Sequence, residues 1–386
     1  MPTFYNFTQD GRVYSFDDIF VPADAFRQGG LWTWGRNFYG QLGNNTTTNR
    51  TTPVTTFAGG NDWKQVSCAY HMAAIKTDGT LWIWGRNLNG QLGNNTATNR
   101  TTPVTTFAGG TNWKQVSCGV LYTAAIKTDG TLWTWGSNAF GQLGDNTTTN
   151  RSTPVTTFAG GTNWKQVSCG VLHTAAIKTD GTLWIWGRNN FAQLGDNTTT
   201  DRSTPVTTFA GGTNWKQVAC GYHTAAIKTD GTLWTWGKNL NGQLGDNTTT
   251  NRSTPVTTFA GSTNWKQVAC GREHTAAIKT DGTLWIWGLN ANNQLGINAP
   301  NNRLTPVTTF AGGTNWKQVS CAYHTAAIKT DGTLWTWGIN TYGQLGDNTT
   351  TSRSTPVTTF AGGTNWKQIS CGEENTMAST YIDDYV

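Results

Sequence analysis

The stretch HTAAIKTDGTLWTWG (residues 223–237) occurs nearly unchanged six times in the chain and identifies a repeating unit. At the two ends only half of it remains: GGLWTWG (residues 29–35) carries the second half, and ENTMASTYIDD (residues 374–384) stands in place of the first. W-x-W-G pairs recur every 50 or 51 residues, and one further tryptophan per unit lies in N-W-K or D-W-K. All 21 tryptophans belong to seven such units. The 386 residues therefore form one array and not several unrelated domains.

Each unit is predicted to contain four short antiparallel strands and no helix. Three strands are indicated in the fifth unit. NWKQVAC alternates between polar and apolar residues, HTAAIKT is centred on small and β-branched residues, and TLWTWG is apolar on both faces. The intervening Asp-Gly is typical of a tight hairpin turn with positive φ angles. A long polar loop and a shorter strand, VTTF, complete the unit. The expected strands are residues 214–220, 223–229, 232–237 and 256–259.

Such units fit the blades of a β-propeller or the coils of a β-solenoid. A solenoid requires polar caps, whereas the ends of this chain are complementary. The last unit has only first and second strands, at residues 366–371 and 376–382, and the first unit begins with a third strand at residues 31–34. We therefore predict an all-β, seven-bladed β-propeller of four-stranded antiparallel blades, closed by pairing of the N- and C-terminal strands.

The propeller is assigned to residues 29–386 as a single domain. Residues 1–28 lie outside the repeats and are interpreted as an N-terminal arm that either docks the propeller onto a larger assembly or covers its edge. Their sequence has no basic start followed by an apolar run, so no secretory signal is visible. No stretch of the chain approaches 18 apolar residues, so no membrane span is expected.

Charge and cysteine content exclude further classes. The net charge is +6, but 20 of the 27 basic residues recur at three fixed repeat positions, such as Lys216, Lys228 and Arg252. Nucleic-acid proteins concentrate basic residues on one side, so no dedicated nucleic-acid site is expected. The seven cysteines occupy equivalent, distant positions and are odd in number, which argues against disulfides. A chain made in a reducing cytoplasm is the simplest account.

Candidate catalytic and metal motifs are incomplete. Cys220 and His223 have the spacing of a metal site or a thiol nucleophile, but a second pair is missing, and Tyr122 and Asn375 replace the histidine in two units. We expect buried cysteines and structural histidines bonded to backbone. The Asp/Asn-rich loop 245–253 lacks a Ca²⁺-loop pattern, and the tryptophan pairs are expected to pack between blades. No catalytic residue, cofactor or metal is therefore predicted, and the protein is expected not to be an enzyme.

The longer segment CGYHTAAIKTDGTLWTWGKNLNGQLGDN (residues 220–247) strongly resembles the repeat of the regulator of chromosome condensation family, and the resemblance covers about residues 29–383. It implies a seven-bladed propeller. Functions in this family diverge: the founding type catalyses nucleotide exchange on a small nuclear GTPase and docks on chromatin, a plant branch senses ultraviolet light through clustered tryptophans, and bacterial members include enzyme inhibitors. The exchange factor would need an inserted wedge and a basic arm, for which the uniform spacing and residues 1–28 offer no counterpart.

Differences among the seven copies fall mainly in two places, the W-G-x-N-x-x segment and the residues just after the cysteine. In an up-and-down blade both loops emerge on one face of the disc, so one face is diverse and the other monotonous. Loops carry recognition on a rigid scaffold, and aromatic residues and arginine dominate contact hot spots. The predicted partner-binding residues are Arg36, Phe38, Tyr39, Tyr70, Arg86, Leu88, Leu121, Phe140, Leu172, Arg188, Phe191, Tyr222, Lys238, Leu240, Arg272, Glu273, Tyr323 and Tyr342.

The leading functional hypothesis is a non-enzymatic recognition or scaffold propeller that presents this face to a protein or glycan. A Thr/Asn-rich surface with 12% charged residues suits a component of a larger surface assembly, a virion or cell-surface decoration or adhesin. Neutral drift at exposed tips is the competing explanation, although drift should also have altered the long Thr/Asn tract, which is nearly constant outside the sixth unit. The alternative function is guanine-nucleotide exchange or a chromatin-associated regulator, as in the founding family member.

Overall fold

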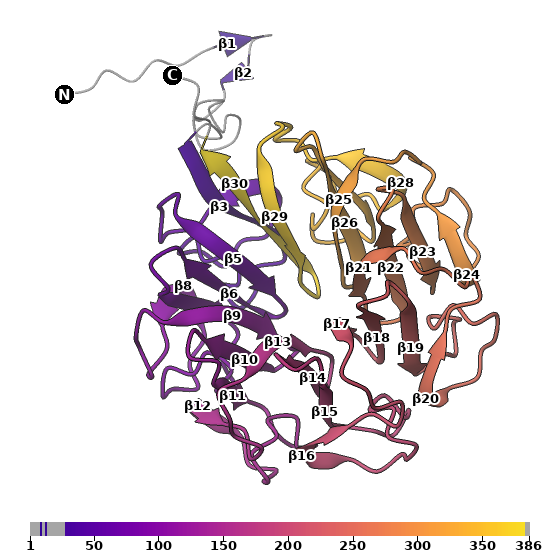
Figure 1. The fold of residues 1–386 in the computed structure, drawn as a ribbon. Helices are drawn as coiled ribbons and strands as arrows, with labels where there is room; N and C mark the ends of the chain where they lie inside the picture. Colours follow the sequence, from indigo (N-terminus) through magenta and orange to yellow (C-terminus); the bar gives the residue numbers. More distant parts are fainter. Residues whose placement is uncertain (1–7, 10–11, 14–27, 383–386) are drawn as a thin grey trace.

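Seven four-stranded antiparallel sheets surround a central axis (Figure 1). The structure is a computed structural model that describes residues 8–9, 12–13 and 28–382. Every element in these residues is a strand. The predicted all-β, seven-bladed propeller is therefore confirmed. Outside the blades, β1 (Thr8–Gln9) pairs with β2 (Arg12–Val13). Of the rest of the proposed N-terminal arm only Gln28 is described, and it belongs to the first blade, where it pairs with Ile382.

Six blades consist of four strands that are consecutive in sequence. The fifth unit forms blade 5, with β17 (Trp215–Cys220), β18 (His223–Lys228), β19 (Leu233–Gly237) and β20 (Arg252–Thr257). The others are blade 2, β5 (Trp63–Cys68), β6 (His71–Lys76), β7 (Leu81–Gly85) and β8 (Arg100–Thr105); blade 3, β9 (Trp113–Cys118), β10 (Tyr122–Lys127), β11 (Leu132–Gly136) and β12 (Arg151–Thr156); blade 4, β13 (Trp164–Cys169), β14 (His173–Lys178), β15 (Leu183–Gly187) and β16 (Arg202–Thr207); blade 6, β21 (Trp265–Cys270), β22 (His274–Lys279), β23 (Leu284–Gly288) and β24 (Arg303–Thr308); and blade 7, β25 (Trp316–Cys321), β26 (His324–Lys329), β27 (Leu334–Gly338) and β28 (Arg353–Thr358).

Blade 1 joins the two ends of the described chain. Its order is β29 (Trp366–Cys371), β30 (Asn375–Ile382), β3 (Gln28–Gly35) and β4 (Arg50–Thr55). β3 and β30 pair antiparallel, with Trp32 opposite Ala378 and Trp34 opposite Thr376. The pairing predicted from the two half-repeats is confirmed. It closes the ring within blade 1 and leaves neither β3 nor β30 with an unpaired edge.

The fourth strand of each blade was misplaced by the sequence prediction. β20 covers Arg252–Thr257 and not residues 256–259, because Gly237 pairs with Arg252 and Thr235 with Val256 across an irregular register. Its polar start and Pro255 indicated a loop. The outermost strand of a blade has a free edge, where a proline that lacks an N–H donor is tolerated. Similarly, only Gly231 of the Asp-Gly turn takes a positive φ, +81°.

The apolar core lies between neighbouring blades. Second strands are buried on both faces, as from His223 to Ile227, and pack against the tryptophans of the next blade. Trp287 is fully buried and donates its Nε1–H to the Gln243 carbonyl of blade 5, 3.0 Å away. Gly245, with φ +68°, lies under this ring, and a Cβ there would come within 2.7 Å of Nε1. The G-Q-L-G segment is therefore a packing motif that fills the space between blades.

A buried polar network also joins each pair of blades, and we call the junction between two blades a seam. Between blades 5 and 6, His223 Nε2 lies 2.6 Å from Thr275 Oγ1, which donates its hydrogen to the Gln243 carbonyl. The histidine must therefore carry its proton on Nε2. Five seams contain such a pair, and each histidine bonds a threonine hydroxyl and not backbone as expected. Burial lowers the pKa of each of these histidines to about 3.

The part of the chain that the structure describes contains no helix that is long and apolar enough to cross a bilayer.

Candidate recognition face

Both variable loops of a blade leave the sheet at the same end. His223, which follows one loop, pairs with Gly237, which precedes the other. The Asp-Gly turn joins β18 and β19 at the opposite end. We call the end with the variable loops the variable face, and the end with the Asp-Gly turns and the A-G-G-T-N connections the constant face.

The variable face carries one exposed loop tip per blade, the residue that directly follows the asparagine of W-G-x-N-x-x. All seven are exposed: Phe38, Leu88, Ala139, Asn190, Leu240, Ala291 and Thr341. Three of them are large and apolar, with Phe38 65%, Leu88 57% and Leu240 60% exposed. These three predicted contact residues are therefore available to a partner.

Four seams carry a cation stacked on an aromatic ring at the variable face. The cation directly follows W-G in one blade, and the ring ends W-G-x-N-x-x in the blade before it. Centroid distances are 5.0 Å for Arg86 on Tyr39, 4.6 Å for Arg188 on Phe140, 5.1 Å for Lys238 on Phe191 and 5.0 Å for Arg36 on Tyr342. All eight residues are partly buried. They were predicted as partner contacts, and in the structure they contact one another.

The other three seams have no cation and no aromatic ring at these positions. They combine an asparagine with a neutral residue: Asn89 with Ser137, Asn241 with Leu289, and Asn292 with Ile339. Cation and ring thus occur together or not at all, in seven seams out of seven. Much of the variation on this face is therefore pairwise and serves contacts between blades.

A second group of predicted residues gathers near the axis. Arg272 donates to Glu373, with 2.5 Å between Nε and Oε2, and its guanidinium lies 4.6 Å from the Tyr323 ring and 5.7 Å from that of Tyr222. Burial raises the pKa of Glu373, although Arg272 opposes this. Burial also raises the pKa of Tyr323 to about 12. The cluster is a preformed, charge-paired arrangement of arginine and tyrosine.

Ion pairs extend this cluster outward. Lys238 and Glu273 pair across the seam between blades 5 and 6, with 2.5 Å between Nζ and Oε1, and Asn241 donates to the other carboxylate oxygen of Glu273. Arg36 pairs with Glu374 within blade 1. The predicted contact residues did not include Glu373, Glu374 and Asn241. The paired acidic residues of the last copy, at positions held elsewhere by Tyr, Val-Leu or Arg-Glu, were the signal that could have identified the two glutamates.

Predicted residues with smaller roles are Tyr70, Leu121 and Leu172, all partly buried. The guanidinium of Arg86 lies 5.5 Å from the Tyr70 ring, so this arginine sits between two tyrosines. The carbonyl groups of Leu121 and Leu172 accept hydrogen bonds from the backbone N–H groups of Ser137 and Arg188. Their backbone thus fastens the two variable loops of a blade to each other.

Two cavities of about 220 Å³ open near the axis. One is lined by the ends of the seven first strands, including all seven cysteines, with Arg272 and Glu373 at its border. The other is lined by Tyr222, Arg272, Glu273, Leu289, Gln294, Ala322 and Tyr323. This second cavity adjoins Leu289, where a cation stands in four other blades, and it is open to a partner's side chain.

The cysteines of the axial cavity are unsuited to nucleophilic chemistry. Burial raises the pKa of Cys169 and of Cys371 to about 12, whereas a reactive cysteine requires a lowered pKa. Cys371 Sγ donates to the Ser320 carbonyl of blade 7, 3.3 Å away. Within the described residues no three His, Cys, Asp or Glu side chains are arranged to hold a metal ion.

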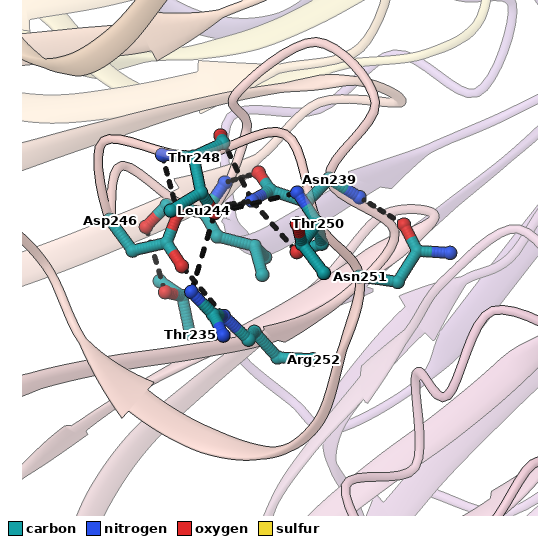
Figure 2. A network of polar contacts seen from close by, with 8 residues as sticks. All are labelled: Thr235, Asn239, Leu244, Asp246, Thr248, Thr250, Asn251 and Arg252. Atoms are coloured by element: carbon teal, nitrogen blue, oxygen red, sulfur yellow. Dashed lines mark hydrogen bonds and ion pairs between the residues drawn. The ribbon is translucent and has the colours of Figure 1, made fainter.

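The Thr/Asn tract owes its constancy to a buried asparagine (Figure 2). Asn239 is fully buried, accepts from the Leu244 N–H and donates to Asp246 and to the carbonyls of Thr248 and Thr250. In the sixth blade, where the tract differs, Ile297 and Ala299 replace the acid and the first threonine. Because the tract has this structural constraint, its constancy does not discriminate between recognition and drift at the tips.

Comparisons with known proteins agree with this architecture. A family model for the RCC1-like domain matches residues 106–384, and models for the regulator of chromosome condensation (RCC1) repeat match residues 28–75, 78–126 and 63–91. The ultraviolet-B receptor UVR8 of Arabidopsis thaliana is 34% identical over 205 residues, 52% of this chain and 46% of the receptor. The X-linked retinitis pigmentosa GTPase regulator homolog of Caenorhabditis elegans is 40% identical over 78 residues, 20% of this chain and 6% of the relative. The chain thus matches less than half the length of these curated relatives.

Among solved structures, human WBSCR16 superposes with a TM-score of 0.80 at 22% identity and covers 91% of this chain and 99% of its own. Prp20p of Saccharomyces cerevisiae superposes with a TM-score of 0.80 at 17% identity and covers 94% of this chain and 95% of its own. These two likenesses concern the fold.

Proposed function

The chain belongs to the RCC1-like domain family, and from that premise we propose that it is a protein-recognition propeller whose variable face binds a protein partner. The exposed tips Leu88, Leu240 and Phe38 and the cavity beside Tyr222 and Tyr323 form the contact surface. Prp20p of Saccharomyces cerevisiae, which shares the fold, has binding properties towards Gsp1p and histones, and this precedent is consistent with protein binding by such a propeller.

The observation that carries the proposal is the separation of seam residues from exposed loop tips. Cation–aromatic pairs join the blades at the seams, whereas the tips Leu88 and Leu240 are exposed, and the exposed tip Phe38 also packs edge-on against Tyr39. A rigid support with a few exposed anchors binds at low entropic cost, because little has to be ordered on association. Tyr and Arg at the neighbouring cavity are the residue types that dominate binding hot spots.

We extend the proposal to a place in a larger surface assembly, on a virion or a cell. Support for this context is compositional: 12% of the residues are charged, and the connecting loops are rich in Thr and Asn. Immunogold labelling of the intact source particle or cell tests it, since label confined to the interior would contradict surface display.

Site-specific crosslinking tests the proposed contact surface. A photoreactive phenylalanine analogue placed at Leu88 or Leu240 should crosslink one protein in an extract of the source, whereas the analogue at Phe107 or Phe259 on the constant face should not. With that protein purified, the double substitution Leu88→Ser/Leu240→Ser should weaken its binding at least tenfold, since a hot-spot residue contributes more than about 1 kcal/mol.

Unchanged affinity of the double variant would overturn the assignment of this face. Binding to an immobilised glycan array with the same dependence on Leu88 and Leu240 would replace the protein partner by a glycan. Accelerated nucleotide release from a small GTPase would favour the exchange-factor alternative.

A further inference from the structure

The constant face carries an exposed phenylalanine in every blade. Phe57, Phe107, Phe158, Phe209, Phe259, Phe310 and Phe360 occupy one repeat position and are 61–69% exposed. In blade 5, Trp234 pairs with Thr257. β20 ends at Thr257, so Phe259 lies in the turn that follows the outer strand, at the start of the connection to blade 6, and its backbone N–H donates to the Gly245 carbonyl, 2.8 Å away. Isolated exposed apolar residues are ordinary, but here the same large aromatic residue recurs in all seven blades on a single face.

Lysines form a second ring on the same face, nearer the axis. They occupy the second position of each first strand, and these strands lie against one another around the axis. Six are exposed and Lys367 is partly buried; the exposed ones are Lys64, Lys114, Lys165, Lys216, Lys266 and Lys317. The A-G-G-T-N connection links the two rings, since it leads from each phenylalanine to the lysine of the next blade.

Partly buried tryptophans lie between the two rings. Lys228 has its Nζ 4.8 Å from the Trp215 ring and 4.7 Å from that of Trp234, which is partly exposed. The same arrangement recurs in the five other blades built from consecutive strands. Among its described residues the constant face has thirteen lysines and seven aspartates. The aspartates are the six of the Asp-Gly turns and Asp62. The face is therefore both aromatic and positively charged.

Sevenfold repetition restricts what such a face can match. A folded protein without matching symmetry presents no seven equivalent sites, whereas a lipid bilayer is uniform in its plane. A second copy of this face would bring the two lysine rings together, and like charges oppose that contact. Exposed aromatics enter the boundary between headgroups and acyl chains, tryptophan favours the membrane interface, and lysine is attracted to anionic headgroups.

We propose that the constant face is a peripheral membrane-binding surface that docks the disc flat on an anionic bilayer. The phenylalanines provide apolar insertion and the lysine ring provides charge attraction. This orientation directs the variable face away from the membrane, so the two faces can be occupied at once. The inference does not depend on the partner of the variable face.

Co-sedimentation with vesicles tests it. The full chain should sediment with phosphatidylcholine vesicles that contain about 30% phosphatidylserine, an anionic lipid, and remain largely in the supernatant with pure phosphatidylcholine. The triple substitution Phe57→Ser/Phe158→Ser/Phe259→Ser should weaken binding at least tenfold. The matched control is Phe38→Ser/Leu88→Ser/Leu240→Ser, which removes comparably exposed side chains from the variable face and should bind as the unaltered chain does.

A charge variant, Lys114→Glu/Lys216→Glu/Lys317→Glu, should abolish the preference for phosphatidylserine. All these side chains are exposed, so circular dichroism should show an unchanged fold. The proposal is overturned if the chain does not bind anionic vesicles, if the control triple weakens binding as much as the phenylalanine triple, or if heparin in solution binds with the same dependence on the phenylalanines as the vesicles do.

Discussion

Neighbouring blades are joined in the interior of the seam by a histidine–threonine hydrogen bond in five seams, and at its rim on the variable face by a cation–aromatic pair in four. The interior uses neutral, fully buried hydrogen bonds such as His223 to Thr275, whereas the rim uses partly buried cation–aromatic pairs such as Arg86 on Tyr39. Both levels show paired changes. Where Asn375 replaces the histidine, Met72 replaces the threonine of the next blade, and Asn375 bonds the Ala69 carbonyl instead. Where Tyr122 replaces the histidine, the threonine of the next blade is kept, and Thr174 Oγ1 lies 3.2 Å from the Tyr122 hydroxyl. Variation in the interior of a seam and paired variation at its rim are therefore structural, and recognition is to be sought among exposed residues that change singly.

Lowering the pH should have the largest effect of the changes considered, because it destabilises the interior hydrogen bonds of the seams and not the cation–aromatic pairs of the rim. Because the pKa of each interior histidine is lowered to about 3 from an ordinary value near 6.5, the unfolded chain binds more protons than the folded one between these limits. Stability should be nearly constant above pH 6.5 and fall as the pH decreases towards 3. At pH 5 the loss is about 2 kcal/mol per histidine and on the order of 10 kcal/mol for all five, whereas the rim pairs should not respond.

Denaturant unfolding followed by tryptophan fluorescence at pH 7.5 and pH 5.0 measures this effect. His223→Asn is the matched control, since asparagine occupies the equivalent position in blade 1. It should reduce the difference between the two pH values by about 2 kcal/mol. Equal stability of the unaltered chain at both pH values would contradict the assignment.

Breaking one interior hydrogen bond should have the next largest effect. Thr275→Val removes the acceptor of the His223 Nε2–H and leaves a buried donor unpaired, at a cost of about 1–3 kcal/mol in the free energy of unfolding. The double substitution His223→Asn/Thr275→Met introduces the residue pair found between blades 1 and 2. It should lower the free energy of unfolding by less than the sum of the two single substitutions. If the losses in unfolding free energy were strictly additive, the residues at positions 223 and 275 would not be coupled.

The rim should give the smallest effect. Arg86→Ala removes a cation from between Tyr39 and Tyr70 and should cost about 0.5–1 kcal/mol. A double-mutant cycle with Tyr39→Leu should recover most of this as coupling energy. Leu88→Ala, on the neighbouring exposed tip, should change stability by less than about 0.5 kcal/mol. If Leu88→Ala lowered stability more than Arg86→Ala, the assignment of Arg86 to a structural role and of Leu88 to partner contact would be contradicted.

Most of the fold could be predicted from the sequence. The nearly identical copies share one strand pattern, and the half-copies at the two ends predict that their strands pair and close the ring. The start of the fourth strand could not, since Arg252 and Pro255 carry the polar signature of a loop, and only pairing with Gly237 makes them a strand. The variable positions were identifiable, but their partners were not. Tyr39 and Arg86 are far apart in the chain and meet only once the order of blades around the ring is known.

Closure by β3 and β30 has a kinetic consequence. β3 is synthesised before the six other blades, and its partner β30 only after them. Until then β3 presents an open edge, and the contact that completes the ring is among the longest-range contacts in the molecule, a feature that slows folding and favours misassembly. The growing chain thus remains vulnerable to strand exchange with another copy until translation reaches its last repeat.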